Sequence, residues 1–230
     1  MCEFCHGWSF LVYGFERIFV YKDCWDWVRK TFIFLIYCII MQFLGGADDI
    51  EGIMLLSKLF SFVQNIPYRI VHFDDGSYAC SENVNIFIKM GDCRHKSLLL
   101  YNLLQEKNFP VEKVKVIFDW KDLPIPHEIL GLLKKSGTIW SHDALKLNTN
   151  PYYPIYIDAT WNSELERLGF PVTKAWDGKG STKNVTNGKV EFFDADGFRN
   201  ENHGIHIDRI EASEFGEALN AWLDKVSPIK

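Results

Sequence analysis

Apolar side chains recur every three or four positions in several parts of the chain after residue 47. Between residues 48 and 64 this spacing joins Ile53, Leu56 and Phe60, which predicts an amphipathic helix. The same pattern predicts helices over 93–106 and 212–226. Asn65–Pro67 ends the first of them, and Pro110 prevents continuation of the second beyond Asn108.

A different pattern, with apolar and polar residues alternating, predicts β-strands between these helices. Residues 113–118 alternate in this way, and strand-like runs follow at 139–147 and 152–161. The regions 72–90 and 170–200 are rich in turn-forming residues and are predicted to be loops, and 121–138 is predicted to be a loop with a short helix. Helices and strands that do not alternate regularly indicate an α+β fold.

The last two strands are predicted to form a hairpin, because Asn148–Pro151 between them is a turn signal. The midpoint of positions 142 and 158 is 150, which lies inside this turn. A regular antiparallel hairpin would therefore place His142 directly opposite Asp158, with Cβ atoms about 5 Å apart.

The first 46 residues have another character. They hold four of the six cysteines and the most apolar run of the chain, at 32–44, before a break at Gly45–Asp49. We therefore expect an N-terminal appendage, 1–46, and a folded domain, 47–230. The apolar run is thirteen residues long, whereas a membrane-spanning helix needs about 20. A short membrane anchor within 28–46, a buried or interfacial helix, and an artefact of start-site choice all remain open.

Composition and charge exclude several classes of function. The net charge of −5 and the absence of a basic run argue against nucleic acid as a partner. No glycine-rich phosphate loop is present. Cys2–Cys5–His6 and His203–His206 are short matches to metal-ligand spacing and are best interpreted as chance, so we predict neither a metal nor a cofactor.

The strongest chemical signal is a cysteine at the predicted start of the helix at 93–106. Asp92 is a good N-cap, which places Cys93 at the first helical position, where free N–H groups and the helix dipole favour an anion. The basic residues 94–96 add positive charge, and Gly91 allows a close backbone approach. Cys93 is therefore a candidate thiolate nucleophile; the alternative is an inert buried thiol.

His142 and Asp158 provide the two partners that such a nucleophile needs. A histidine on one strand can serve as the general base, and a carboxylate beside it can fix its tautomer. Taken singly, His142 would be an ordinary strand histidine and Asp158 a strand-end cap. Together with Cys93 they predict a catalytic triad.

These residues resemble the transglutaminase-like superfamily, whose members have a papain-like core. The resemblance rests on Gly91–Asp92–Cys93 before an apolar helix, on His142, and on the stretch Asp158–Trp161. The stretch Phe62–Tyr68 is also similar to the end of the helix that precedes the cysteine in such domains, so the resemblance covers roughly 48–165.

The resemblance implies a cysteine helix packed on an antiparallel sheet that carries the histidine and the aspartate. It also implies thiol-dependent acyl transfer on amide bonds of a protein or peptide, with no cofactor. The acyl group would pass to water, as in a cysteine peptidase or amidase, or to an amine, as in cross-linking. Hydrolysis is the preferred fate, because no calcium cage or dedicated amine site is evident. The backbone N–H of Cys93 is the candidate oxyanion donor.

Two other functions remain open. One is a non-catalytic protein-binding module on the same fold, tethered to a membrane; the other is a redox or metal protein that uses the N-terminal cysteines. A free Cys93 favours a reducing compartment such as the cytoplasm, whereas the run at 32–44 favours membrane association.

Overall fold

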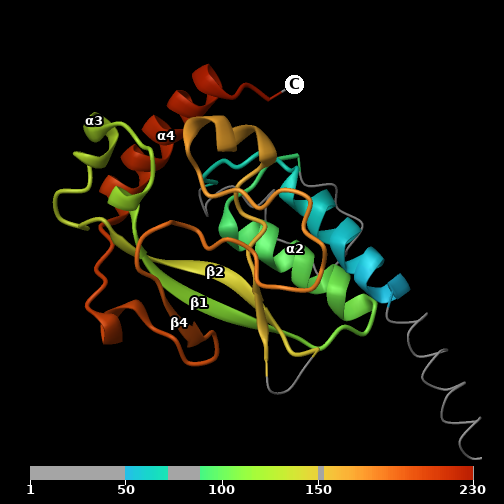
Figure 1. Cartoon of the computed structure of the whole chain (residues 1–230). Helices are drawn as coiled ribbons and strands as arrows, with labels where there is room; N and C mark the ends of the chain where they lie inside the picture. The colour runs from blue at the N-terminus through green and yellow to red at the C-terminus, as the bar shows by residue number, and fades with distance from the viewer. Residues whose placement is uncertain (1–49, 72–88, 150–152, 230) are drawn as a thin grey trace, which may run out of the picture. The chain divides into compact units, whose positions relative to one another are not determined.

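The computed structural model describes residues 50–71, 89–149 and 153–229 (Figure 1). Apart from residues 50 and 51, all of them belong to a compact unit that runs from Gly52 to Lys230. The predicted appendage at 1–46, with its apolar run, lies outside the described residues. Within the described ranges, no helix is long and apolar enough to cross a membrane.

Four antiparallel strands form the sheet that the described residues contain, in the order β3–β2–β1–β4. The strands are β1 (Val111–Asp119), β2 (Ile139–Leu147), β3 (Ile155–Ile157) and β4 (Glu191–Asp194). The prediction for 139–147 is confirmed as β2, and that for 113–118 lies inside β1. The chain thus has the expected α+β class. β4 falls in a region predicted to be a loop, because only Phe192 and Phe193 in its four residues are apolar.

The hairpin register differs from the one predicted. β2 and β3 pair through Leu145 with Ile157 and through Leu147 with Ile155, so the ladder is centred on position 151 rather than 150. The prediction that His142 lies directly opposite Asp158 is therefore wrong. Because side chains alternate with a period of two, this shift moves Asp158 two positions along the strand and keeps it on the same face as His142.

Helix α2 (Cys93–Glu106) has the predicted bounds. It begins at Cys93 because the Asp92 side chain caps it, accepting a hydrogen bond from the backbone N–H of Arg94. It ends before Asn108, whose φ of 59° turns the chain into the left-handed region. The helix predicted over 48–64 occupies 50–64 in the described residues.

The last long helix, α4 (Arg209–Val226), begins three residues before the predicted start at 212. The Asp208 side chain accepts hydrogen bonds from the backbone N–H groups of Ile210 and Glu211, and these bonds set the start. The shorter elements are η2 (Trp120–Asp122), α3 (His127–Leu130), η3 (Ser163–Leu168) and η4 (Asn200–His203). The first two of these fill the insertion predicted at 121–138.

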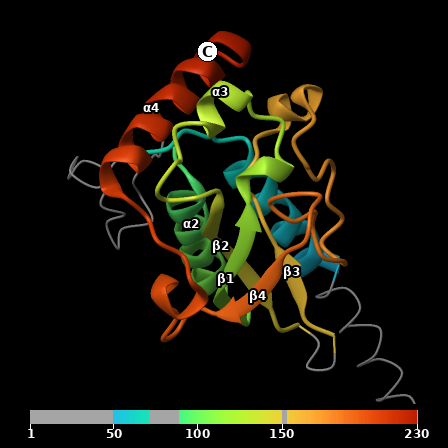
Figure 2. The same cartoon turned by 90° about the vertical axis from the view of Figure 1, so that its left-hand side faces the viewer.

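Two buried clusters of the described residues lie on opposite faces of the sheet, as the alternation along its strands requires. Helix 50–64 and α2 cover one face, where Leu145 and Leu147 are buried with Leu100. α4 contributes to the other cluster, which contains Val116 and Phe118. Figures 1 and 2 show α2 running along the sheet, and α4 beside α3 near one end of it. The first of these clusters holds α2 against β2.

Candidate active site

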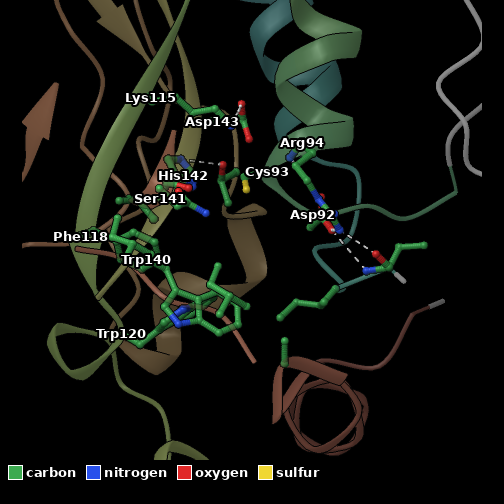
Figure 3. A pocket seen from close by; sticks show the side chains of 18 of the residues that line it. Asp92, Cys93, Arg94, Lys115, Phe118, Trp120, Trp140, Ser141, His142 and Asp143 are labelled. Atoms are coloured by element: carbon green, nitrogen blue, oxygen red, sulfur yellow. Dashed lines mark hydrogen bonds and ion pairs between the residues drawn. The ribbon is translucent and has the colours of Figure 1, made fainter. Parts of the chain in front are cut away.

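A cleft of about 1010 Å³ opens beside the first turn of α2. Figure 3 shows Cys93 between two walls, with Phe118, Trp120 and Trp140 on the strand side and Asp92 and Arg94 on the helix side. Residues of η4, of the chain after it and of α4 also contribute to the lining: Asn200, Glu201, Ile205, His206, Ile207, Arg209, Ala212 and Ser213. The cleft is large enough for several residues of an extended peptide.

Cys93 is a free, half-buried thiol at the first position of α2. The chain before it is held by a parallel β-bridge between Gly91 and Tyr68, in which the Gly91 N–H donates to the Pro67 carbonyl over 3.1 Å. The first N–H groups of a helix have no partner within it. Among the described residues the Cys93 N–H has no hydrogen-bond partner, so it is available to a ligand.

The structure brings His142 and Asp158 together. The Nε2 atom of His142 lies 2.8 Å from Oδ2 of Asp158, and His142 is only 2% exposed. The other carboxylate oxygen of Asp158 accepts a hydrogen bond of 3.0 Å from the Thr160 N–H. The Asp158 N–H in turn donates to the Thr182 hydroxyl over 2.8 Å. The carboxylate is thus fixed on both oxygens, and it orients the imidazole.

Charges around His142 favour its protonated form. Burial alone would lower the pKa of His142. The charges of Asp158 and then Cys93, together with hydrogen bonds to both residues, act in the opposite direction and raise that pKa well above its ordinary value. For Asp158, burial would raise the pKa, and the facing imidazolium holds it below its ordinary range instead. The arrangement therefore stabilises the imidazolium form of His142.

The basic residues 94–96 do not simply surround the thiol as the sequence suggested. Arg94 forms an ion pair with Asp92, and the Nδ1 atom of His95 lies 2.8 Å from Oδ1 of Asp92. Burial works against the Asp92 charge, but these two partners hold its pKa well below the ordinary range. Burial would also lower the pKa of Arg94, and Asp92 raises it, with a smaller contribution from the Cys93 thiolate. Of these side chains, Arg94 and Asp92 line the cleft, whereas His95 does not.

Lys96 lies inside the domain rather than in the cleft. Its side chain has no exposed surface, and its amine donates to three backbone carbonyls: Gln64 at 3.1 Å, Ile66 at 2.7 Å and Thr160 at 2.7 Å. Burial lowers the pKa of Lys96 to about 7, although the Asp158 carboxylate acts in the opposite direction. This amine ties the end of the helix at 50–64 to the segment that carries Asp158.

Several residues of the site were not predicted from the sequence. The aromatic wall formed by Trp120 and Trp140 comes from the start of η2, directly after β1, and from the start of β2. Thr160 lay within a recognised motif, but its contact with Asp158, which includes a backbone hydrogen bond of 3.0 Å, was not predicted.

No metal site is found in the described part of the chain, where no group of three or more His, Cys, Asp or Glu side chains could hold an ion. His203 packs on the rings of Phe193 and Phe198, and His206 lines the cleft. The other candidate spacing, Cys2–Cys5–His6, lies outside the described residues.

Comparisons with known proteins add nothing to this geometry. No family model matches the chain, and no curated protein or solved structure is similar to it.

Proposed function

We propose that the protein is a transglutaminase-like acyl-transfer enzyme that uses Cys93 as nucleophile, His142 as general acid and base, and Asp158 as the group that orients His142. The observation that carries this proposal is the His142–Asp158 pair, 2.8 Å long, because its histidine lines the same cleft as the helix-start thiol. The proposal gives these three residues, which lie far apart in the chain, the roles that thiol catalysis requires.

In the proposed reaction, the Cys93 thiolate attacks the carbonyl carbon of an amide, and a carbon–sulfur bond forms as the carbonyl electron pair moves to oxygen. His142, protonated in the resting state, gives its proton to the leaving nitrogen as the carbon–nitrogen bond breaks. His142 then takes a proton from the second nucleophile, which attacks the thioester and releases Cys93. Asp158 stays ionised and keeps the imidazole in position.

The cleft supports a peptide or protein segment as the proposed substrate. It is open and about 1010 Å³ in volume, and its aromatic wall is continuous with charged side chains, among them the Lys115–Asp143 ion pair at 2.8 Å. This mixture suits a peptide or protein segment, in which apolar and polar groups alternate. Water is the preferred acceptor, so the enzyme would act as a peptidase or amidase.

The proposal is tested with p-nitrophenyl acetate, which acylates an active thiol and releases a coloured phenolate. The full chain should release p-nitrophenolate and gain one acetyl group, located on Cys93 by peptide mass spectrometry. Cys93→Ala should lose both signals, whereas Ser141→Ala, a hydroxyl in the same cleft, should keep them. Adding a primary amine then separates the two acyl acceptors, because transfer yields an N-acetylated amine and hydrolysis yields acetate.

A wild-type protein that is folded yet gains no acetyl group on Cys93 would contradict the proposal and favour a non-catalytic binding module.

A further inference from the structure

Tyr68 lies next to the proposed nucleophile without having been assigned a role. It follows the helix at 50–64 and forms the parallel bridge with Gly91, two residues before Cys93. It is 3% exposed and lines the same cleft as Cys93 and His142. Its position therefore depends on the strand-like contact that also fixes the start of α2.

The aromatic ring of Tyr68 is held firmly. Its centroid lies 4.5 Å from that of Trp161, in a tilted arrangement that aromatic pairs prefer. Its backbone N–H donates to the Asn162 side-chain oxygen over 3.0 Å. Both contacts come from the segment just after Asp158, so the ring is fixed relative to the triad as well as to Cys93.

The hydroxyl group of Tyr68, in contrast, has no hydrogen-bond partner among the described residues. The Tyr68 oxygen is not among the fully buried side-chain atoms without a partner in the described residues, so it retains some exposed surface, and such a group at a cleft is one that a ligand can satisfy. Burial raises the pKa of Tyr68 well above its ordinary value, and the next contribution comes from the Cys93 thiolate. The phenol therefore stays protonated near the sulfur, as a hydrogen-bond donor must.

We propose that the Tyr68 hydroxyl and the Cys93 backbone N–H together form the oxyanion hole of this site. When the thiolate adds to the carbonyl carbon, the electron pair of the C=O bond moves to oxygen, and the resulting oxyanion accepts one hydrogen bond from each donor. No proton leaves Tyr68. The pair returns to carbon as the leaving group departs with the proton from His142. This inference rests on the proposed acyl transfer and adds a catalytic residue to it.

The test compares two reactions of the same thiol in Tyr68→Phe, which keeps the ring on Trp161 and removes only the hydroxyl. Acetylation by p-nitrophenyl acetate passes through an oxyanion, whereas alkylation by iodoacetamide does not. Losing one oxyanion donor costs about 10²-fold to 10³-fold in rate. We expect a loss of that order in acetylation of Cys93 and an unchanged alkylation rate. Tyr101→Phe is the matched control and should alter neither reaction. Tyr101 lies on α2, and the Lys113 Nζ atom lies over its ring, 4.5 Å from the ring centroid.

The outcomes separate the two proposals. If Cys93 is acetylated in the wild-type protein and at the same rate in Tyr68→Phe, the oxyanion role of Tyr68 is wrong, whereas the proposed triad is unaffected. Equal losses of acetylation and alkylation would also overturn it, because Tyr68 would then act on the thiolate itself. A wild-type Cys93 that is alkylated but never acetylated would overturn the proposed acyl transfer, and the oxyanion role with it. Thermal unfolding of each variant confirms that the folded fraction is the same.

Discussion

Two histidine–aspartate pairs of the same length flank Cys93, and they differ in what else their carboxylates bind. His95 lies 2.8 Å from Asp92 on the helix side, and His142 lies 2.8 Å from Asp158 on the strand side. By distance alone, either histidine would qualify as the base of a cysteine enzyme.

The Asp92 carboxylate is occupied by the fold itself. Besides His95 it binds Arg94 and caps α2, and it accepts a hydrogen bond of 3.3 Å from the Val71 N–H. His95 is not among the described residues that line the cleft. This pair therefore anchors the start of the helix on which Cys93 lies.

The Asp158 carboxylate has a simpler environment, in which Thr160 supplies the hydrogen bonds found among the described residues besides that of His142. His142 lines the cleft, and the Cys93 thiolate is one cause of its raised pKa. The two pairs therefore differ in the other partners of the carboxylate and in whether the imidazole lines the cleft, and these differences make His142 the candidate for catalysis.

The comparison predicts its largest effect for the two histidines. His142→Ala should slow acetylation of Cys93 by p-nitrophenyl acetate about 10³-fold, because Cys93 loses the group that holds its proton and stabilises the thiolate. His95→Ala should change the rate per folded molecule far less and lower stability instead. Stopped-flow release of p-nitrophenolate, with the folded fraction measured by circular dichroism, gives both numbers. A reversal of this order would make His95 the base; His127, which is exposed on α3, would come next.

Substitutions of the two aspartates should differ in the same way as those of the two histidines, with a smaller effect on the acetylation rate. Asp158→Asn should reduce acetylation about 10²-fold, since it removes the anion that stabilises the imidazolium. Asp92→Asn remains a good N-cap but loses its charge beside Arg94, and should lower the free energy of unfolding by about 1–3 kcal/mol. Urea titration and the acetylation assay are applied to both variants. A loss of rate in Asp92→Asn together with a loss of stability alone in Asp158→Asn would contradict this assignment.

Lys96 offers a pH test of the scaffold that joins the two sides. Its pKa is lowered to about 7 from an ordinary 10.5, so between these values the unfolded chain binds more protons than the folded one. Stability should therefore rise with pH across that window, by up to about 1.4 kcal/mol per pH unit from this group. Lys96→Met should lose this part of the slope in urea titrations between pH 7 and pH 10. Identical slopes in the two proteins would show that Lys96 stays charged in the fold.

A smaller effect concerns the coupling between His142 and the thiol. Cys93→Ala removes a negative charge that favours the imidazolium, so the pKa of His142 should fall below its wild-type value. Ser141→Ala leaves the thiol in place and serves as the control. The titration of the His142 ring protons by NMR measures the change, and an unaltered pKa would mean that the thiolate does not act on His142.

The sequence predicted most of the local structure around this site. The bounds of α2 and β2 followed from periodicity and from the Asp92 cap, and the residues 93, 142 and 158 were selected by their type and spacing. Sequence patterns alone could not supply the hairpin register. A turn signal fixes the position of a loop only approximately, and the ladder centre moved from 150 to 151. This shift leaves Asp158 on the same face of the sheet as His142, so the two side chains are in contact although the predicted register was wrong.

Other features depend on tertiary contacts that leave no local pattern. The positive charges at 94–96 were expected around the thiol, but Arg94 and His95 bind Asp92, and Lys96 is drawn into the interior by three carbonyl groups. The position of Tyr68 at the cleft likewise arises from a bridge to Gly91, a residue 23 positions away in the chain.

The central claim is that Cys93, His142 and Asp158 act as one unit, and a double-mutant measurement tests it most directly. The acetylation rate of Cys93 is compared in wild type, His142→Ala, Asp158→Asn and the variant that carries both changes. Groups that act together give non-additive losses. The account predicts that the double variant is no slower than His142→Ala alone, because Asp158 acts only through His142. Losses that multiply in the double variant would contradict the account and show that the two residues act independently.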